Sequence, residues 1–271
     1  PREVACTYFA VTSLFASYCS AIVLAVHMSS NARQLSSFCF DFDILLIQKD
    51  KYKHCQYISL LFDSFRLWYF CRKNKMLGLQ MATDPRWVEI VEKNIEEILI
   101  DHAYCEQKAA SNAISLIVAY PQYADLVTAM SAICKEEMEH FELVHEKLQE
   151  RGLKLGFERK DPYVNDLAQY LKHTKTNNTP AGVFVNKMLF AAMIEARSCE
   201  RFKILSEEIA DEDLQNFYRG LMESEARHYT TFLSFARKYS NGIDVDAAWK
   251  EFLAFEAELM ASYGKKETMH G

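Results

Sequence analysis

The chain has 271 residues, of which 50% are hydrophobic and 25% are charged, a composition that excludes a disordered or fibrous protein. With only 8 glycines and 5 prolines, long helices are favoured over a fold rich in tight turns. The 8 cysteines form no Cys-x-x-Cys pair, which excludes the usual zinc-ribbon patterns and favours a reducing, cytoplasmic location.

Residues 1–75 differ in character from the rest of the chain. They hold five of the cysteines, and no helical or strand period persists in them. Their uncharged stretch 5–26 has two interpretations, a membrane span or signal-like segment, or part of an N-terminal extension outside the folded domain. The second is favoured because Ser, Thr, Tyr and Cys dilute the apolar run, and it places the start of the functional domain at Met76.

Residues 76–271 are acidic, with 22 basic and 32 acidic side chains. This balance argues against a broad electrostatic surface for binding nucleic acid, although it permits a local basic patch. No membrane association is expected for this part of the chain.

Helical patterns then follow one another from Thr83 onward. Thr83-Asp84-Pro85 is a helix-start signal, and Asp161-Pro162 begins a shorter helix. Long amphipathic runs are expected at about 86–119, 123–149, 182–209, from about 211 to 239, and 245–263. Two helical hairpins joined by the long connection 151–180 predict an all-α fold, a ferritin-like four-helix bundle with an extra C-terminal helix.

A carboxylate and an imidazole recur three residues apart on two of these helices. Glu137 and His140 lie on the second long helix, and Glu225 and His228 repeat the spacing on the fourth. Positions three apart lie within roughly 60° of one another around a helix, so each pair faces the same space. Such pairs are suitable ligands for iron or manganese, and two copies in equivalent places are stronger evidence than one.

Each of the other two helices would contribute one carboxylate. Glu106 falls in the apolar stripe of the first helix. On the third helix, Glu195 is preferred to Glu200 because it shares a stripe with Phe184, Met188 and Ala192. Spacing agrees, since 31 residues separate Glu106 from Glu137 and 30 separate Glu195 from Glu225. The alternative is that these residues form ordinary surface salt bridges, and His102 is expected to be a core or surface histidine.

A pair of iron ions in such a site would support several outcomes with dioxygen. The candidates are hydroxylation or desaturation of an organic substrate, iron handling, and an oxidase or peroxidase activity; a non-catalytic helical bundle is a fourth interpretation. The absence of Cys-x-x-Cys from the sequence weighs against a peroxidase that carries its own electron-transfer iron.

Four stretches resemble the MiaE family of tRNA hydroxylases: DHAYCEQKAASNAISLI (101–117), KEEMEHFELVHEKLQERG (135–152), IEARSCERF (194–202) and FYRGLMESEARHYTTFL (217–233). The resemblance covers 76–271. It implies a dioxygen-dependent non-haem diiron monooxygenase that hydroxylates the isopentenyl group of 2-methylthio-isopentenyl-adenosine beside the tRNA anticodon. The implied ligands are Glu106, Glu137, His140, Glu195, Glu225 and His228, and electrons would come from a separate reductase.

The connection between the hairpins carries a local excess of basic residues. Arg151, Lys154, Lys172 and Lys175 contribute to it, with three acidic residues against six basic ones over 151–175. We expect the tRNA backbone to contact this segment, with a merely solvated loop as the alternative.

Overall fold

The computed structural model describes residues 76–262 and Met269, and the structural statements below concern these residues. The extension 1–75, with its uncharged stretch 5–26, lies outside them. The elements in chain order are η2 (Met76–Gly78), α4 (Trp87–Lys93), α5 (Ile95–Ala119), α6 (Ala124–Glu150), α7 (Pro162–Lys172), η3 (Lys175–Asn178), α8 (Pro180–Glu208), α9 (Glu212–Lys238) and α10 (Val245–Ser262). None of the described helices is long and apolar enough to cross a membrane.

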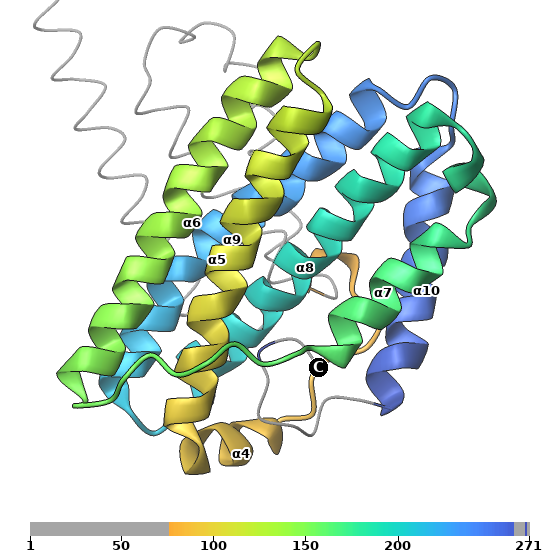
Figure 1. Ribbon diagram of the computed structural model, residues 1–271. Helices are drawn as coiled ribbons and strands as arrows, with labels where there is room; N and C mark the ends of the chain where they lie inside the picture. Colours follow the sequence, from red (N-terminus) through yellow and green to blue (C-terminus); the bar gives the residue numbers. More distant parts are fainter. Residues whose placement is uncertain (1–75, 263–268, 270–271) are drawn as a thin grey trace, which may run out of the picture. The chain divides into compact units, whose positions relative to one another are not determined.

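Helices α5, α6, α8 and α9 form the bundle, with α5 packed along α6 and α8 along α9 (Figure 1). At one end, the rings of Tyr123 and Tyr239 stack with centroids 3.9 Å apart. At the other end, Arg151 donates to Asp211 over 2.9 Å. The connection with α7 crosses between the hairpins, and α10 packs on α8. The expected ferritin-like bundle with a long crossover and an extra C-terminal helix is therefore confirmed.

Polar caps fix where several of these helices begin. The Asp161 carboxylate accepts from the backbone N–H of Tyr163 over 2.9 Å, and Asp211 accepts from that of Leu214 over 3.1 Å. Thr179 Oγ1 accepts from Gly182 N over 3.0 Å. Each bond satisfies a backbone donor that has no partner inside its own helix, so α7, α9 and α8 begin close to their predicted positions.

The first long run differs from the prediction of one helix over 86–119. The chain breaks at Asn94, whose φ of −138° is not helical and whose side chain donates to the carbonyl of Ile90 over 2.8 Å. Asparagine competes in this way for backbone partners inside a helix. Within the predicted start signal, no side chain caps α4, and the N–H and hydroxyl of Thr83 both donate to Glu200.

Two apolar clusters fill the bundle, one toward each end. One contains Ala113, Met130, Ile133, Phe184, Ala192 and Phe232, and the other contains Leu99, Ala103, Val144, Phe202 and Leu221. Along α5 and α6 the predicted ligands lie between members of the two clusters, whereas on α8 and α9 Ala196 and Ala226 of the first cluster directly follow Glu195 and Glu225. The candidate site is thus a polar layer between two apolar regions, each of which excludes water from it.

A separate buried ion-pair network attaches α10 to α8. Arg197 is fully buried and donates to Glu256 over 2.5 Å and to Glu200 over 2.9 Å. The Tyr163 hydroxyl on α7 also donates to Glu256, over 2.8 Å. This network joins α7, α8, α10 and the segment before α4 on the outside of the bundle.

Candidate metal centre

All four bundle helices contribute to one buried cluster of carboxylates and imidazoles. Its members are Glu106 on α5, Glu137 and His140 on α6, Glu195 on α8, and Glu225 and His228 on α9, each between 0% and 7% exposed. The helical spacing produces this convergence because the Glu-x-x-His pairs of α6 and α9 turn the same face inward.

The cluster divides into two groups with two members in common. Glu106, Glu137, His140 and Glu225 form one group, and Glu137, Glu195, Glu225 and His228 form the other. Within each group, one ligand atom from every residue lies within 4.8 Å of the others. Two cations held this way would share Glu137 and Glu225, and each would have one further carboxylate and one imidazole of its own.

Hydrogen bonds at the outer nitrogen orient both imidazoles. Ser224 Oγ donates to the carbonyl of Leu221 over 2.7 Å, so the 3.1 Å contact with His140 is a bond donated by Nε2–H of that ring. His228 Nε2 lies 2.8 Å from a carboxylate oxygen of Glu136 and donates to it. The Nδ1 atoms of both rings therefore face the carboxylates, as a metal ligand requires.

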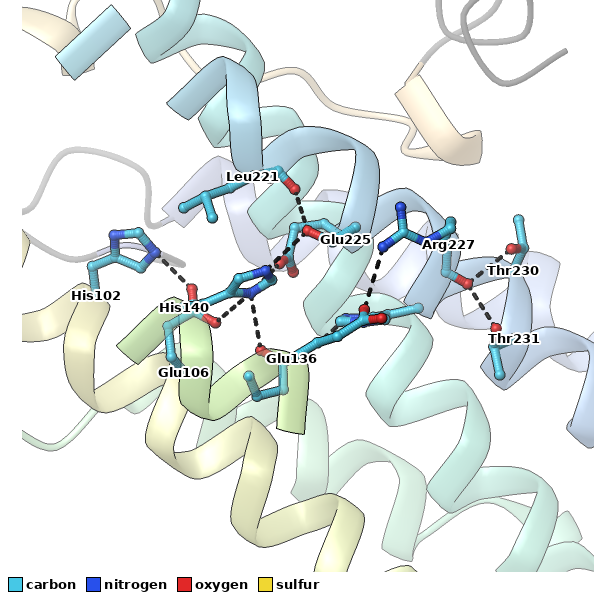
Figure 2. A network of polar contacts seen from close by, with 12 residues as sticks. His102, Glu106, Glu136, His140, Leu221, Glu225, Arg227, Thr230 and Thr231 are labelled. Carbon is cyan, nitrogen blue, oxygen red and sulfur yellow. Dashed lines mark hydrogen bonds and ion pairs between the residues drawn. The ribbon is translucent and has the colours of Figure 1, made fainter. Parts of the chain in front are cut away.

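The distances around His140 show how closely the carboxylates approach. Its Nδ1 lies 3.5 Å from Glu106, 3.6 Å from Glu137 and 3.4 Å from Glu225. Figure 2 shows this ring beside Glu106 and Glu225, with Glu136 on the side of Arg227. His228 Nδ1 lies 2.8 Å from Glu137.

Without a cation, burial and the crowded charges raise the pKa values of several members of the cluster. Burial together with Glu137 and Glu106 raises the pKa of Glu225 to about 8. Burial, Glu225 and Glu137 likewise raise the pKa of Glu195 well above its usual range. Burial alone would lower the pKa of His140, but the neighbouring carboxylates of Glu106 and Glu137 raise it to about 11. The site is therefore built to hold positive charge among its carboxylates.

Unsatisfied atoms test whether a metal pair fits these residues. Both carboxylate oxygens of Glu137, one of Glu225, and the Nδ1 atoms of His140 and His228 are buried without a hydrogen-bond partner. Buried polar atoms normally have partners, so their convergence requires an explanation. Two divalent cations would satisfy them and balance the charge of four carboxylates, and oxygen and imidazole donors suit iron or manganese.

The structure also separates the two carboxylates considered on the third bundle helix. Glu195 lies with the other five cluster members, whereas Glu200 is absent from the cluster. Glu200 is 5% exposed and accepts from Thr83 and Arg197, so it belongs to the network that attaches α10. The segment before α4 lies against Glu200 through the N–H and hydroxyl of Thr83.

Three residues outside the predicted set contact the cluster. Ser224 and Glu136 bond the outer nitrogens of the two histidines, and His102 Nε2 lies 2.6 Å from Glu106. Figure 2 shows His102 pointing at Glu106 from one turn earlier on α5. Their positions in the sequence could have indicated these contacts. Glu136 and Ser224 each precede a shared glutamate, and His102 is four residues before Glu106, on the same helix face.

A recess of about 300 Å³ reaches the cluster from the surface between α6 and α9. It is lined by Glu136, Glu139, His140, Gly220, Glu223, Ser224 and Arg227. Because His140 belongs to the cluster and also lines the recess, this opening brings solvent to the edge of the candidate metal site. Its lining is mostly charged, which suits water, protons and cations rather than an apolar group.

The four basic residues expected to contact tRNA lie at opposite ends of the bundle. Arg151 follows the C-terminus of α6 and is ion-paired with Asp211 and Asp213, each over 2.9 Å. Lys154 is exposed and follows it closely. Lys172 and Lys175 are exposed beside the start of α8, at the end where Tyr123 meets Tyr239. They do not form one patch.

Comparison with known proteins adds family and fold information. A family model described as tRNA-(MS[2]IO[6]A)-hydroxylase (MiaE) matches residues 71–271. A Pseudomonas putida protein named tRNA 2-(methylsulfanyl)-N(6)-isopentenyladenosine(37) hydroxylase is 37% identical over 192 residues, 71% of this chain and 91% of that protein. A Salmonella typhimurium protein of the same name is 29% identical over 268 residues, 79% of this chain and 95% of that protein.

One solved structure supports the architecture. It is described as protein 43 with aldehyde deformylating oxygenase activity from Synechococcus. The two chains superpose with a TM-score of 0.63 at 30% identity, over 71% of this chain and 95% of that one.

Proposed function

The chain belongs to the MiaE family of tRNA hydroxylases, and from that premise we propose that it is a dioxygen-dependent diiron monooxygenase. It hydroxylates the isopentenyl group of 2-methylthio-isopentenyl-adenosine in tRNA. The observation that carries this proposal is the pair of buried ligand groups sharing Glu137 and Glu225. Residues 76–271 form the hydroxylase domain, and its substrate is consistent with a cytoplasmic location.

The six clustered residues are the proposed ligands. Glu106 and His140 would complete one metal position and Glu195 and His228 the other, and Glu137 and Glu225 would serve both. Two ferrous ions bound there would supply the capacity to reduce dioxygen and to place one of its oxygen atoms in a C–H bond. The other oxygen atom leaves as water, which requires two electrons from a separate reductase and two protons.

The protein's own part is to fix ligand geometry and to control solvent. Ser224 and Glu136 hold the two imidazoles with Nδ1 inward, so neither ring can turn away. The apolar clusters on both sides keep water from the reacting centre. Glu139 and Glu223 in the recess provide exposed carboxylates next to His140 for the protons that oxygen reduction consumes.

We place the contact with the tRNA anticodon loop at the end of the bundle that carries Lys172 and Lys175. A second recess there, of about 460 Å³, is lined by Tyr120, Tyr123, Pro180, Phe184, Lys238, Tyr239 and neighbouring residues. Single-stranded loops are recognised by stacking of bases on aromatic rings and by lysine contacts to phosphate. Arg151 is less suited to phosphate contact because two aspartates already neutralise it.

The test is an assay of oxygen transfer to tRNA. Iron-reconstituted protein, a reductase system and ¹⁸O₂ are incubated with tRNA that carries the unhydroxylated nucleoside, and the digested nucleosides are analysed by mass spectrometry. The proposal predicts a product with one ¹⁸O atom in the isopentenyl group. A parallel incubation with a long-chain aldehyde tests the activity named for the Synechococcus structure. Deformylation without tRNA hydroxylation would contradict the proposal.

A further inference from the structure

The two halves of the metal centre correspond residue by residue. Glu106 corresponds to Glu195, and the Glu-x-x-His pair of α6 corresponds to that of α9. The residue before each shared glutamate bonds the histidine of the other hairpin: Ser224 bonds His140, and Glu136 bonds His228. Differences between the halves therefore mark places where the protein treats the two metal positions unequally.

Ser224 and Glu136 already differ in charge, and a second difference lies behind the terminal carboxylates. His102, four residues before Glu106, is fully buried and has its Nε2 2.6 Å from Glu106 Oε1. Four residues before Glu195 the chain has Ala191, whose methyl group offers no hydrogen bond. The carboxylate of Glu106 is thus held from behind by the imidazole of His102. The equivalent position behind Glu195 is occupied by Ala191, which cannot hold that carboxylate.

Aromatic rings hold His102 in place. Its ring centroid lies 4.9 Å from that of Phe202, 6.0 Å from Phe217 and 5.6 Å from Tyr218. Its Nδ1 is buried without a hydrogen-bond partner, so no other polar group turns the ring away from Glu106. A neutral imidazole in this setting carries its hydrogen on Nε2 and donates it to the carboxylate.

The two carboxylate oxygens of Glu106 have different partners. Oε1 accepts from His102, while Oε2 lies 3.5 Å from His140 Nδ1, on the metal side. With one oxygen engaged, the carboxylate is held to binding a metal through the other oxygen alone. Partners of this kind behind a ligand fix its orientation and strengthen metal binding.

We propose that His102 is a positioning residue that holds Glu106 as a one-oxygen ligand and thereby makes the two metal positions unequal. The position of Glu106 and His140 keeps a fixed terminal carboxylate and binds its metal more tightly. The position of Glu195 and His228 has the terminal carboxylate that is free to change its binding mode, so it is the one that opens to a reactant. This inference rests on the proposed diiron function.

The experiment is an anaerobic titration of metal-free protein with Co²⁺, followed by competition with a chromophoric chelator. Wild-type protein should bind two ions in two resolved steps. His102→Leu should weaken the tighter step by about 10- to 100-fold and leave the weaker step unchanged. His102→Gln, whose side-chain N–H can reach the place of Nε2, should restore most of the lost affinity.

A matched control separates positioning from packing. Tyr218→Phe removes a buried hydroxyl that has no hydrogen-bond partner and keeps the ring against His102, so both steps should remain as in wild type. Circular dichroism confirms that each variant is folded.

The outcomes that would overturn the proposal are distinct. Unchanged binding in folded His102→Leu would refute it while leaving the diiron function intact. Equal weakening of both steps without rescue by His102→Gln would make His102 a packing residue and also refute it. Failure of the wild-type protein to bind two ions would overturn the proposed function, and this inference with it.

Discussion

Glu137 on α6 and Glu225 on α9 each belong to both groups of ligand atoms in the bundle core. They occupy equivalent places in the two hairpins, and neither is more than 2% exposed. A carboxylate buried this deeply is costly unless it is paired, and two of them facing each other are more so. Shared coordination of two cations would account for both.

Substitutions on α8 should separate metal binding from folding. Glu195→Ala is expected to reduce iron from about two per chain to about one while leaving the fold intact, because it removes the terminal carboxylate of one metal position only. Glu200→Ala should keep both irons but destabilise the protein, since Thr83 and Arg197 lose their acceptor. Metal analysis and urea unfolding of both variants measure this; the reverse pattern would identify Glu200 as the ligand.

The stability of the metal-free protein should fall as pH rises from 5 to 9. Glu225 has a folded pKa of about 8 against an ordinary 4.5, so its contribution is complete below 4.5 and is lost as pH rises through 8. His140 and His228, whose pKa values are raised to about 11 and 10 from 6.5, contribute fully below 6.5 and lose that contribution at higher pH. The three groups act in the same direction.

Urea unfolding at pH 5, 7 and 9 tests this dependence. Bound metal requires the deprotonated ligands, so the gap in stability between metal-loaded and metal-free protein should widen with pH. Glu225→Gln, whose amide does not titrate, is the control and should show a shallower slope. A metal-free protein that gains stability between pH 5 and 9 would contradict the expectation.

The network around Arg197 should matter to folding and not to the metals. Arg197→Met leaves Glu256 and Glu200 buried without their cation and is expected to cost about 3–5 kcal/mol in the free energy of unfolding. Lys203→Met is the matched control, because Lys203 pairs with an exposed Glu207 and should change stability by less than about 1 kcal/mol. Equal effects of the two substitutions would show that burial of the network adds nothing.

Reversal of charge at Lys172 and Lys175 tests the tRNA surface. Replacing both with Glu should weaken tRNA binding and reduce the slope of its salt dependence by roughly 0.7–0.9 for each phosphate that the protein no longer neutralises. Lys154→Glu, at the other end of the bundle, should have little effect. Binding isotherms at several salt concentrations measure both quantities, and unchanged binding in the double variant would remove this end of the bundle from the interface.

Much of the fold and of the candidate site was predictable because it depends on periodicity within single helices. The Glu-x-x-His pairs, the stripe that contains Glu195 and the capping residue Asp161 are local signals, and the structure places these residues as expected. The break at Asn94 was missed because one polar residue in a long amphipathic run is usually tolerated.

Contacts between helices were not predictable in the same way. Glu136 carries a side chain 39% exposed and still bonds His228 from another helix. Buried Glu200 accepts a hydrogen bond from the backbone of Thr83, 117 residues earlier in the chain. His102 gains its role from rings on α8 and α9. Such relationships depend on how the helices pack against one another, which the periodicity of single helices does not reveal.

The most direct test of the central claim is the iron content and optical spectrum of the anaerobically reconstituted full chain, compared with a Glu137→Ala, His228→Ala double variant. We expect about two irons per wild-type chain and their loss in the folded variant, because the variant removes a shared carboxylate and an imidazole. Equal iron in both proteins, or none in wild type, would contradict the diiron site and favour a non-catalytic helical bundle.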